Sequence, residues 1–469
     1  MRNIWLSFFI ALLSLFSIAQ ASVGLQTQTL PAAPVPQEAA AQTMPGGASN
    51  GLPQTGVPPV GPGSQAALTL KQADALAVKN NPQVSVARLS ALASQQVVRE
   101  VRSNLWPTAV ANVTGVDSRA NSRITAGGLN NPIIYPRAAV GAAVGQLITD
   151  FGHTTNLVSS ARLTAKAEDQ NAIATKEEIL LAVDQAFYGA LQAHAVLTVA
   201  QQTVSARQTL VDQVDALFRS KLKSQLDLSF ANVNLAQAKL LFLDAENNEN
   251  SALATLSMVL GYSSTQPFQL VEDATPDTAP PGNIDSLVSQ AFTMRPELLS
   301  LEFQYQSAQK LHAAERDSMF PDIRALGVVG DTPVRDPVLS NWYGAVGVNI
   351  EVPIFNGFLY PARSREAALR AQAAQDRMID LRNRISRDVR TSWLNANTAY
   401  ERVSVTRQLV EQANLALDLA QTRYQLGLSS IVELSQAQLQ QTQAQISNAQ
   451  AGYDYRLALA VLRYQTTGI

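Results

Sequence analysis

The chain has 469 residues, of which 46% are hydrophobic and 15% charged, with a formal net charge of −2 and no cysteine. The absence of a basic excess argues against a nucleic-acid partner, and the absence of cysteine excludes disulfides, thiolate metal sites and a cysteine nucleophile. His153, His194 and His312 are scattered and form no metal-spaced pair. The sequence therefore predicts a protein that is not an enzyme and that needs no metal or cofactor.

The amino-terminal residues predict export followed by a spacer. A basic Arg2, an apolar stretch at 4–18 and the small-x-small sequence at 19–21 predict a cleaved signal peptide over residues 1–21. An uncleaved membrane anchor is the alternative, but the apolar stretch is shorter than the ~20 residues that a spanning helix needs. Residues 22–67 are rich in Pro, Gly, Ala and Gln and nearly free of charge, which predicts a flexible leader.

The remainder contains one pattern twice, in repeats at 68–265 and 283–469 that are joined by a linker at 266–282. An X-Pro pair at 81–82 recurs 214 residues later at 295–296. Landmarks of this kind, repeated in the same order, indicate an internal duplication.

After the expected strands the offset between the repeats falls to 206 residues, because Asp150 matches Asn356. The first copy therefore carries eight extra residues between its strands. They are expected to include 127–132, whose Gly-Gly and Asn-Pro chemistry favours a surface loop.

Each repeat is expected to open with a helix, at about 83–105 and 297–319. Both helices should stop at an aromatic-Pro pair, Trp106-Pro107 or Phe320-Pro321, because proline removes a backbone donor and biases the preceding residue toward extended geometry. Four strands are then expected in the chain, at about 108–118, 138–149, 322–331 and 342–354.

The last of these strands alternates clearly, with Val346, Val348 and Ile350 on an apolar face and polar or small residues on the other. By itself this pattern fits a half-buried strand of a soluble sheet. It also fits a strand of an outer-membrane barrel that turns its apolar face to lipid. The signal peptide and the long helices described next favour the barrel.

Two helices of exceptional length are expected at 154–220 and 362–426, because these stretches contain no proline and almost no glycine. At ~1.5 Å per residue each would be a rod of roughly 100 Å. Further helices at about 224–260 and 430–467 should run back along the rods, so that each repeat contributes two helical columns. Since the smallest bacterial single-chain barrels have ~8 strands, four strands predict that several chains share one barrel.

These residues resemble the TolC-like outer-membrane efflux factors over nearly all of 68–467. The resemblance rests on the doubled X-Pro opening, the aromatic-Pro strand entries, the strand exits Leu-Ile-Thr-Asp-Phe-Gly and Pro-Ile-Phe-Asn-Gly, and Tyr424-Gln-Leu-Gly427 before Ile-Val-Glu-Leu at 431–434. It implies an α+β membrane protein: a homotrimer whose twelve-stranded barrel in outer-membrane lipid continues as an α-helical barrel across the periplasm.

The resemblance also implies a pore constriction at the far helical turns, lined by Asp227 and Glu433 and closed by a contact between Tyr424 and Asp227. Gly427 is the turn glycine, and Ser429 stands where relatives carry a basic residue. An alternative stays open, because Ser224-x-x-Asp227 and Ser430-x-x-Glu433 both have the form of helix capping boxes. Lys221, in place of the first copy's glycine, and Lys223 would add positive charge beside Asp227.

The expected function is a passive outer-membrane exit duct of a tripartite efflux or type I secretion system. Its partners would be a periplasmic adaptor and an inner-membrane pump of the RND or ABC type. The alternative function is a periplasmic coiled-coil scaffold or adaptor whose short strands form a soluble sheet.

Overall fold

The computed structural model describes residues 67–116, 122–126, 129–134, 137–272, 278–332 and 340–467. The predicted signal peptide and all but the last residue of the predicted leader lie outside these ranges. Among the described residues, no helix has the length and apolar character required to span a membrane.

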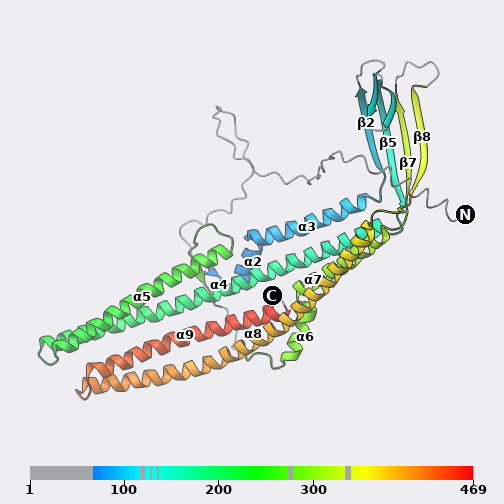
Figure 1. Ribbon diagram of the computed structural model, residues 1–469. Helices are drawn as coiled ribbons and strands as arrows, with labels where there is room; N and C mark the ends of the chain where they lie inside the picture. The colour runs from blue at the N-terminus through cyan, green and yellow to red at the C-terminus, as the bar shows by residue number, and fades with distance from the viewer. Residues whose placement is uncertain are drawn as a thin grey trace, which may run out of the picture. The chain divides into compact units, whose positions relative to one another are not determined.

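The duplicated repeat is confirmed, because the same series of elements occurs twice (Figure 1). The first series is α2 (Leu70–Asn80), α3 (Pro82–Ser103), β2 (Thr108–Val116), β5 (Arg137–Thr149), α4 (His153–Arg219) and α5 (Gln225–Val259). The second is α6 (Ile284–Met294), α7 (Pro296–Asp317), β7 (Asp322–Asp331), β8 (Trp342–Glu351), α8 (Leu359–Gln425) and α9 (Ile431–Thr467). Both rods, α4 and α8, have 67 residues.

Three features differ from the sequence-based expectations. Short helices α2 and α6 precede the expected opening helices, and each ends where an X-Pro pair interrupts the backbone hydrogen bonding. A parallel pair, β1 (Ala67–Leu68) and β6 (Gln269–Leu270), joins the end of the predicted leader to the predicted linker. The expected surface loop at 127–132 is wrong in part, because residues from 129 onward belong to β4 (Leu129–Ile134), which pairs with β3 (Ser122–Ala126).

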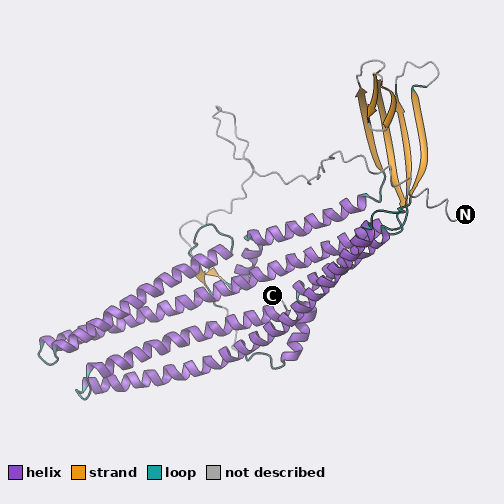
Figure 2. Ribbon diagram, in the orientation of Figure 1, coloured by secondary structure: helices purple, strands orange, loops and turns teal. Residues whose placement is uncertain are grey.

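The four main strands form one antiparallel sheet in the order β2-β5-β7-β8 (Figure 2). Thr108 pairs with Gly145 in the first hairpin, and Asp322 pairs with Glu351 in the second. These two pairs are related by the offsets of 214 and 206 residues, so the two hairpins have the same register. The strands β2 and β8 lie at the edges of this sheet and have no second partner among the described strands.

The helices form four columns side by side. The rod α4 packs against α3 and α5 on one side and against α7 and α9 on the other, while α8 packs against α6, α7 and α9. The expected arrangement of two shorter helices along each rod is therefore confirmed (Figure 1). Midway along the helices, the largest apolar cluster joins Phe187 of α4 to Ala73 of α2 and Leu256 of α5.

The turn from β5 into α4 depends on a glycine. Gly152 has φ +114°, and a Cβ atom at this position would lie 2.9 Å from Oδ2 of Asp317. That carboxylate is buried, accepts a hydrogen bond of 2.7 Å from Asn156 Nδ2, and lies 3.2 Å from the guanidinium of Arg316. A side chain at this position would strain the backbone and would have to displace the Asp317 carboxylate.

We expect Gly152→Ala to lower the free energy of unfolding by about 1–3 kcal/mol, because alanine at this φ is strained and displaces a paired buried carboxylate. Circular dichroism during thermal unfolding in mild detergent measures the change. Gly189→Ala is the control, because Gly189 lies within α4 with open space at its Cβ position, where alanine is neutral or stabilising. Equal melting temperatures for the two variants would contradict the prediction.

Candidate functional site

The candidate site consists of the two helical turns at the ends of the rods. Because α4 and α8 both start directly after the sheet, their last residues lie a full rod length away from it (Figure 1). The turn between α4 and α5 spans residues 220–224, and the turn between α8 and α9 spans residues 426–430. All five residues predicted for the pore or gate lie in or next to these turns.

The two turns reverse the chain by the same backbone geometry with different residues. In the second turn Gly427 has φ +72°, and the amide of Leu428 donates to the carbonyl of Arg423 at 2.8 Å. In the first turn Lys221 has φ +60°, and the amide of Leu222 donates to the carbonyl of Leu217 at 2.9 Å. These bonds satisfy the last carbonyls of each rod, and the lysine adopts a left-handed conformation that glycine adopts without strain.

The capping box at Asp227 is confirmed. The amide of Asp227 donates to Ser224 Oγ at 3.2 Å, and Asp227 Oδ2 accepts from the Ser224 amide at 3.0 Å and from its hydroxyl at 2.6 Å. Burial by itself would raise the pKa of Asp227, but these hydrogen bonds and the charge of Lys223 outweigh burial and lower it. The carboxylate is therefore ionised at neutral pH.

Glu433 has a different partner. Its amide lies 3.5 Å from Ser430 Oγ, at the outer limit of a hydrogen bond, and its carboxylate Oε1 accepts from Arg423 Nε at 3.0 Å. Arg423 belongs to the last turn of α8, so this ion pair joins α8 to α9 directly beside the turn that connects them. Sequence reasoning missed Arg423, because the pair joins two helices across a turn and follows no helical spacing.

Tyr424 is 5% exposed and belongs to an apolar cluster that joins both hairpins. Burial, followed by the charge of Asp227, raises the pKa of Tyr424 to about 12. Its hydroxyl is buried and has no hydrogen-bond partner among the described residues, so no hydrogen bond joins it to Asp227. The hydroxyl of Ser429 is likewise buried without a partner within the described part of the chain.

A lysine contacts the Tyr424 ring. Lys223 Nζ lies 3.8 Å from the ring centroid, well within the range of a cation–π interaction. The contact connects the α4–α5 turn to α8, although the two residues are far apart in the sequence. The structure therefore brings Lys223, Asp227 and Tyr424 together, while Glu433 is engaged separately with Arg423.

Farther from the turns, two polar contacts also join the hairpins. Asn234 Nδ2 of α5 donates to Ser435 Oγ of α9 at 2.7 Å, and Arg207 Nη2 of α4 donates to Thr442 Oγ1 of α9 at 3.4 Å. Arg207 is buried, and burial lowers its pKa to about 10. The hairpins are thus held together by an apolar cluster with polar contacts on either side of it.

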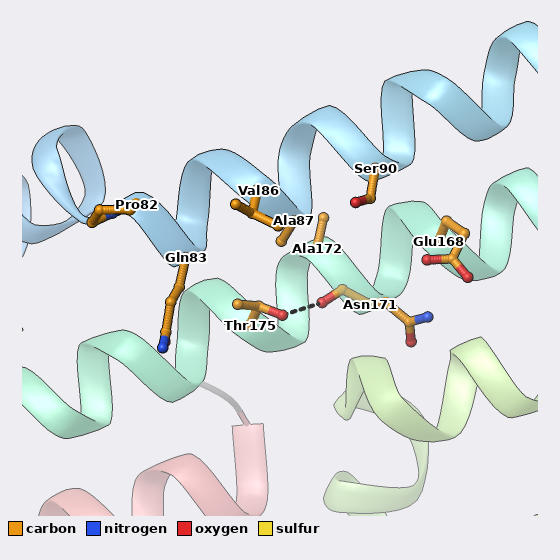
Figure 3. Close-up of a pocket in the computed structure, with 9 residues that line it drawn as sticks. All are labelled: Pro82, Gln83, Val86, Ala87, Ser90, Glu168, Asn171, Ala172 and Thr175. Carbon is orange, nitrogen blue, oxygen red and sulfur yellow. Dashed lines mark hydrogen bonds between the residues drawn. The ribbon is translucent and has the colours of Figure 1, made fainter. Parts of the chain in front are cut away.

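The described residues offer no group of three or more His, Cys, Asp or Glu side chains that could hold a metal ion. A hollow of about 460 Å³ lies between α3 and α4 (Figure 3). Its lining combines aliphatic side chains, including Val86, Ala87 and Ala172, with polar ones, among which Glu168 is the one carboxylate. A surface of this composition suits contact with another helix.

Carboxyl groups with strongly raised pKa values lie midway along the helices instead of at the turns. Burial, together with the neighbouring Asp74 carboxyl, raises the pKa of Asp184 to about 7 against the opposing charge of Arg463. Burial raises the pKa of Asp74 to about 6, and burial with the charge of Glu297 raises that of Glu177 to about 7. These groups bind protons more tightly in the folded than in the unfolded chain.

The stability that such an acid contributes is fully present below about pH 4 and is lost as the pH rises through about 7. We therefore expect a higher melting temperature at about pH 5.5 than at about pH 8. Asp184→Asn, which mimics the protonated acid, should reduce this difference and raise the melting temperature at the higher pH. Asp376→Asn, at an exposed position on α8, is the control. An unchanged pH dependence in Asp184→Asn would exclude this carboxyl as the cause.

The fold therefore places an open antiparallel sheet at one end of two long rods, each paired with shorter helices. The model of the outer membrane efflux protein family matches residues 75–262 and again 287–467, once on each repeat. The chain belongs to the outer membrane efflux protein family.

Known proteins agree with this assignment. Outer membrane protein TolC of Escherichia coli (strain K12) is 22% identical over 391 residues, which cover 80% of this chain and 77% of that protein. Outer membrane efflux protein BepC of Brucella suis biovar 1 is 21% identical over 406 residues, with 84% of each chain covered. The solved structure of the outer membrane protein VceC from Vibrio cholerae matches with a TM-score of 0.74 at 16% identity, covering 85% of this chain and 96% of VceC.

The predicted family, the location and the TolC-like fold of the single chain are thereby confirmed. The chain is an efflux channel of the outer membrane, and its long helices form a large periplasmic portion. The comparisons favour this function over that of a periplasmic scaffold. The roles predicted for Asp227, Glu433, Tyr424, Gly427 and Ser429 stay predictions.

Proposed function

We propose that three copies of this chain form one passive duct, which receives cargo from a periplasmic adaptor and an inner-membrane pump of the RND or ABC type. The observation that carries the proposal is the four-stranded sheet. The outer edges of β2 and β8 have no partner strand in the described chain, and the apolar face of the sheet is strongly exposed. Val113 on β2 is 85% exposed and Val346 on β8 is 92% exposed. Three such sheets would make a twelve-stranded barrel with its apolar side chains in lipid.

Pairing between chains satisfies the edges. In the hydrocarbon region each unpaired backbone group costs several kcal/mol, so an open four-stranded sheet is not viable there. Because the strand order is antiparallel throughout, β8 of one chain is antiparallel to β2 of the next. The barrel can thus close without a change in strand direction.

The helices support the same arrangement. The outer columns expose apolar side chains, including Val86 and Leu89 on α3 and Leu369 and Ile379 on α8. Within the chain, α4 packs against α7, the opening helix of the second repeat. By the repeat relationship, α8 would pack in the same way against α3 of the next chain and cover the hollow between α3 and α4.

In this arrangement the two turns of each chain would gather at the periplasmic end of the duct and narrow it. The gate roles of Asp227, Glu433 and Tyr424 are part of the proposal, as is the division of the chain into a signal peptide at 1–21, a leader at 22–67, and two repeats with their linker. In this proposal the cargo would be selected by the pump.

The internal repeat also predicts the register between chains. Within one chain β5 pairs with β7, so that Val144 lies opposite Gly327. The residue of β8 that corresponds to Val144 lies 206 positions later and is Ile350, and the residue of β2 that corresponds to Gly327 lies 214 positions earlier and is Val113. The repeat therefore predicts that Ile350 lies opposite Val113 of the next chain. Both side chains are exposed, and both belong to the apolar face of the sheet.

We expect the double variant Val113→Cys/Ile350→Cys to form disulfides between chains in the outer membrane, because residues directly opposite on antiparallel strands lie within disulfide range. Non-reducing electrophoresis should show a ladder that stops at three chains. The native chain has no cysteine, so every band reports the introduced pair.

The matched control is Thr114→Cys/Ile350→Cys, because a shift of one residue places the two side chains on opposite faces of the barrel. A ladder that continues beyond three chains, or equal cross-linking in the control, would contradict the trimer and its register. Alkaline extraction of membranes tests the location independently, since a peripheral scaffold would be released and a barrel retained.

A further inference from the structure

We propose that Lys223 fastens the two helical turns of each chain together through the ring of Tyr424, and that it also cancels the negative charge of Asp227. The duct mouth would then be closed by a lysine and would carry no excess of negative charge. This inference rests on the proposed function, in which the turns form the narrow end of the duct.

The fastening contact lies at the extreme end of the hairpins. Lys223 belongs to the α4–α5 turn, whereas Tyr424 lies in the last turn of α8, and the ammonium group is 3.8 Å from the ring centroid. Lys223 is partly buried and Tyr424 is 5% exposed. A cation–π contact strengthens as it is removed from water, so this geometry favours a strong one.

No other polar contact holds the Tyr424 side chain among the described residues. Its hydroxyl has no hydrogen-bond partner, and the nearby Ser429 hydroxyl also lacks one. The next polar contact between the α4–α5 and α8–α9 hairpins is the bond from Asn234 to Ser435, which lies more than two helical turns inside α5. At the mouth itself, Lys223 is therefore the polar link between the hairpins.

The charges near the turns balance. Residues 215–233 and 417–435 contain four acidic and four basic side chains, which are Asp215, Asp227, Asp418, Glu433, Arg219, Lys221, Lys223 and Arg423. Asp215 is paired with Arg219 at 2.7 Å, and Glu433 with Arg423 at 3.0 Å. Lys223 acts on the third carboxylate, that of Asp227. Three copies of a balanced set give a mouth that does not attract cations over anions.

The two roles of Lys223 can be separated because Lys221 lies in the same turn. Lys221 is exposed and has the same charge, but no hydrogen bond, ion pair or ring contact joins its side chain to Tyr424 or to another described residue. Loss of either charge makes the mouth more acidic. Only loss of the Lys223 charge releases the Tyr424 ring.

The test is ion conduction by the reconstituted full-length trimer in planar lipid bilayers with a KCl gradient. Lys223→Gln should raise the conductance at least about threefold and shift the reversal potential toward cation preference. Lys223→Met, which keeps the aliphatic stem, should do the same, while Lys223→Arg should match the native protein.

Lys221→Gln should shift the reversal potential without raising the conductance. Tyr424→Leu should raise the conductance without a comparable shift in reversal potential, and Tyr424→Phe, which keeps the ring, should leave the conductance low. Lys223→Gln combined with Tyr424→Leu should conduct no more than the stronger single variant, because both changes break one contact.

Native conductance in both Lys223→Gln and Lys223→Met would overturn the fastening role. So would a conductance increase in Lys221→Gln equal to that in Lys223→Gln, because charge alone would then explain it. An unshifted reversal potential in Lys223→Gln would overturn the charge role. A native protein that forms no conducting trimer would instead overturn the proposed function, and this inference with it.

Discussion

The hydrogen-bonding requirement of the peptide backbone is the constraint on which the rest of this structure depends. Each chain contributes four strands, and the two edge strands present backbone donors and acceptors that nothing in the described chain satisfies. In lipid such groups must be paired. A four-stranded sheet could therefore lie in lipid only if strands of other chains paired with its two edges, as they would in the proposed trimer.

Because the chain is duplicated, the same contacts could be used within a chain and between chains of the proposed trimer. Because the two hairpins share one register, the pairing between β5 and β7 inside the chain would serve in the proposed trimer as a template for pairing between chains. In the same way, the contact of α4 with α7 would be the template for contact of α8 with α3 of the next chain. The same packing would then be used within a chain and between chains of the proposed trimer.

The turns illustrate how one carboxylate can have two roles. Asp227 caps α5 through Ser224, and in the proposed duct its position beside Lys223 would also make it part of the electrostatics of the mouth. Glu433 lies at the equivalent place in the second repeat, but its carboxylate is directed to Arg423. The repeats therefore share a backbone design and differ in the basic residue that lies beside the acidic group, which is Lys223 in the first repeat and Arg423 in the second.

The sequence alone determined the repeated architecture of this protein. The rods could be predicted to within a few residues because proline and glycine are nearly absent from them, and the strand entries because proline follows an aromatic residue in each repeat. Family membership followed from the order and doubled spacing of these landmarks. The local sequence pattern did not predict α2 and α6, which are short helices. It also did not predict β4, where glycine and proline suggested a loop.

Only the tertiary structure decided the partners of the site residues. The capping box of Asp227 follows from a local spacing and was visible in the sequence, whereas the contact of Lys223 with Tyr424 joins separate hairpins, and the pair of Arg423 with Glu433 spans a turn. Such contacts depend on how neighbouring columns align along their length. That alignment is set by packing across the whole interface, and the spacing of residues within one helix does not encode it.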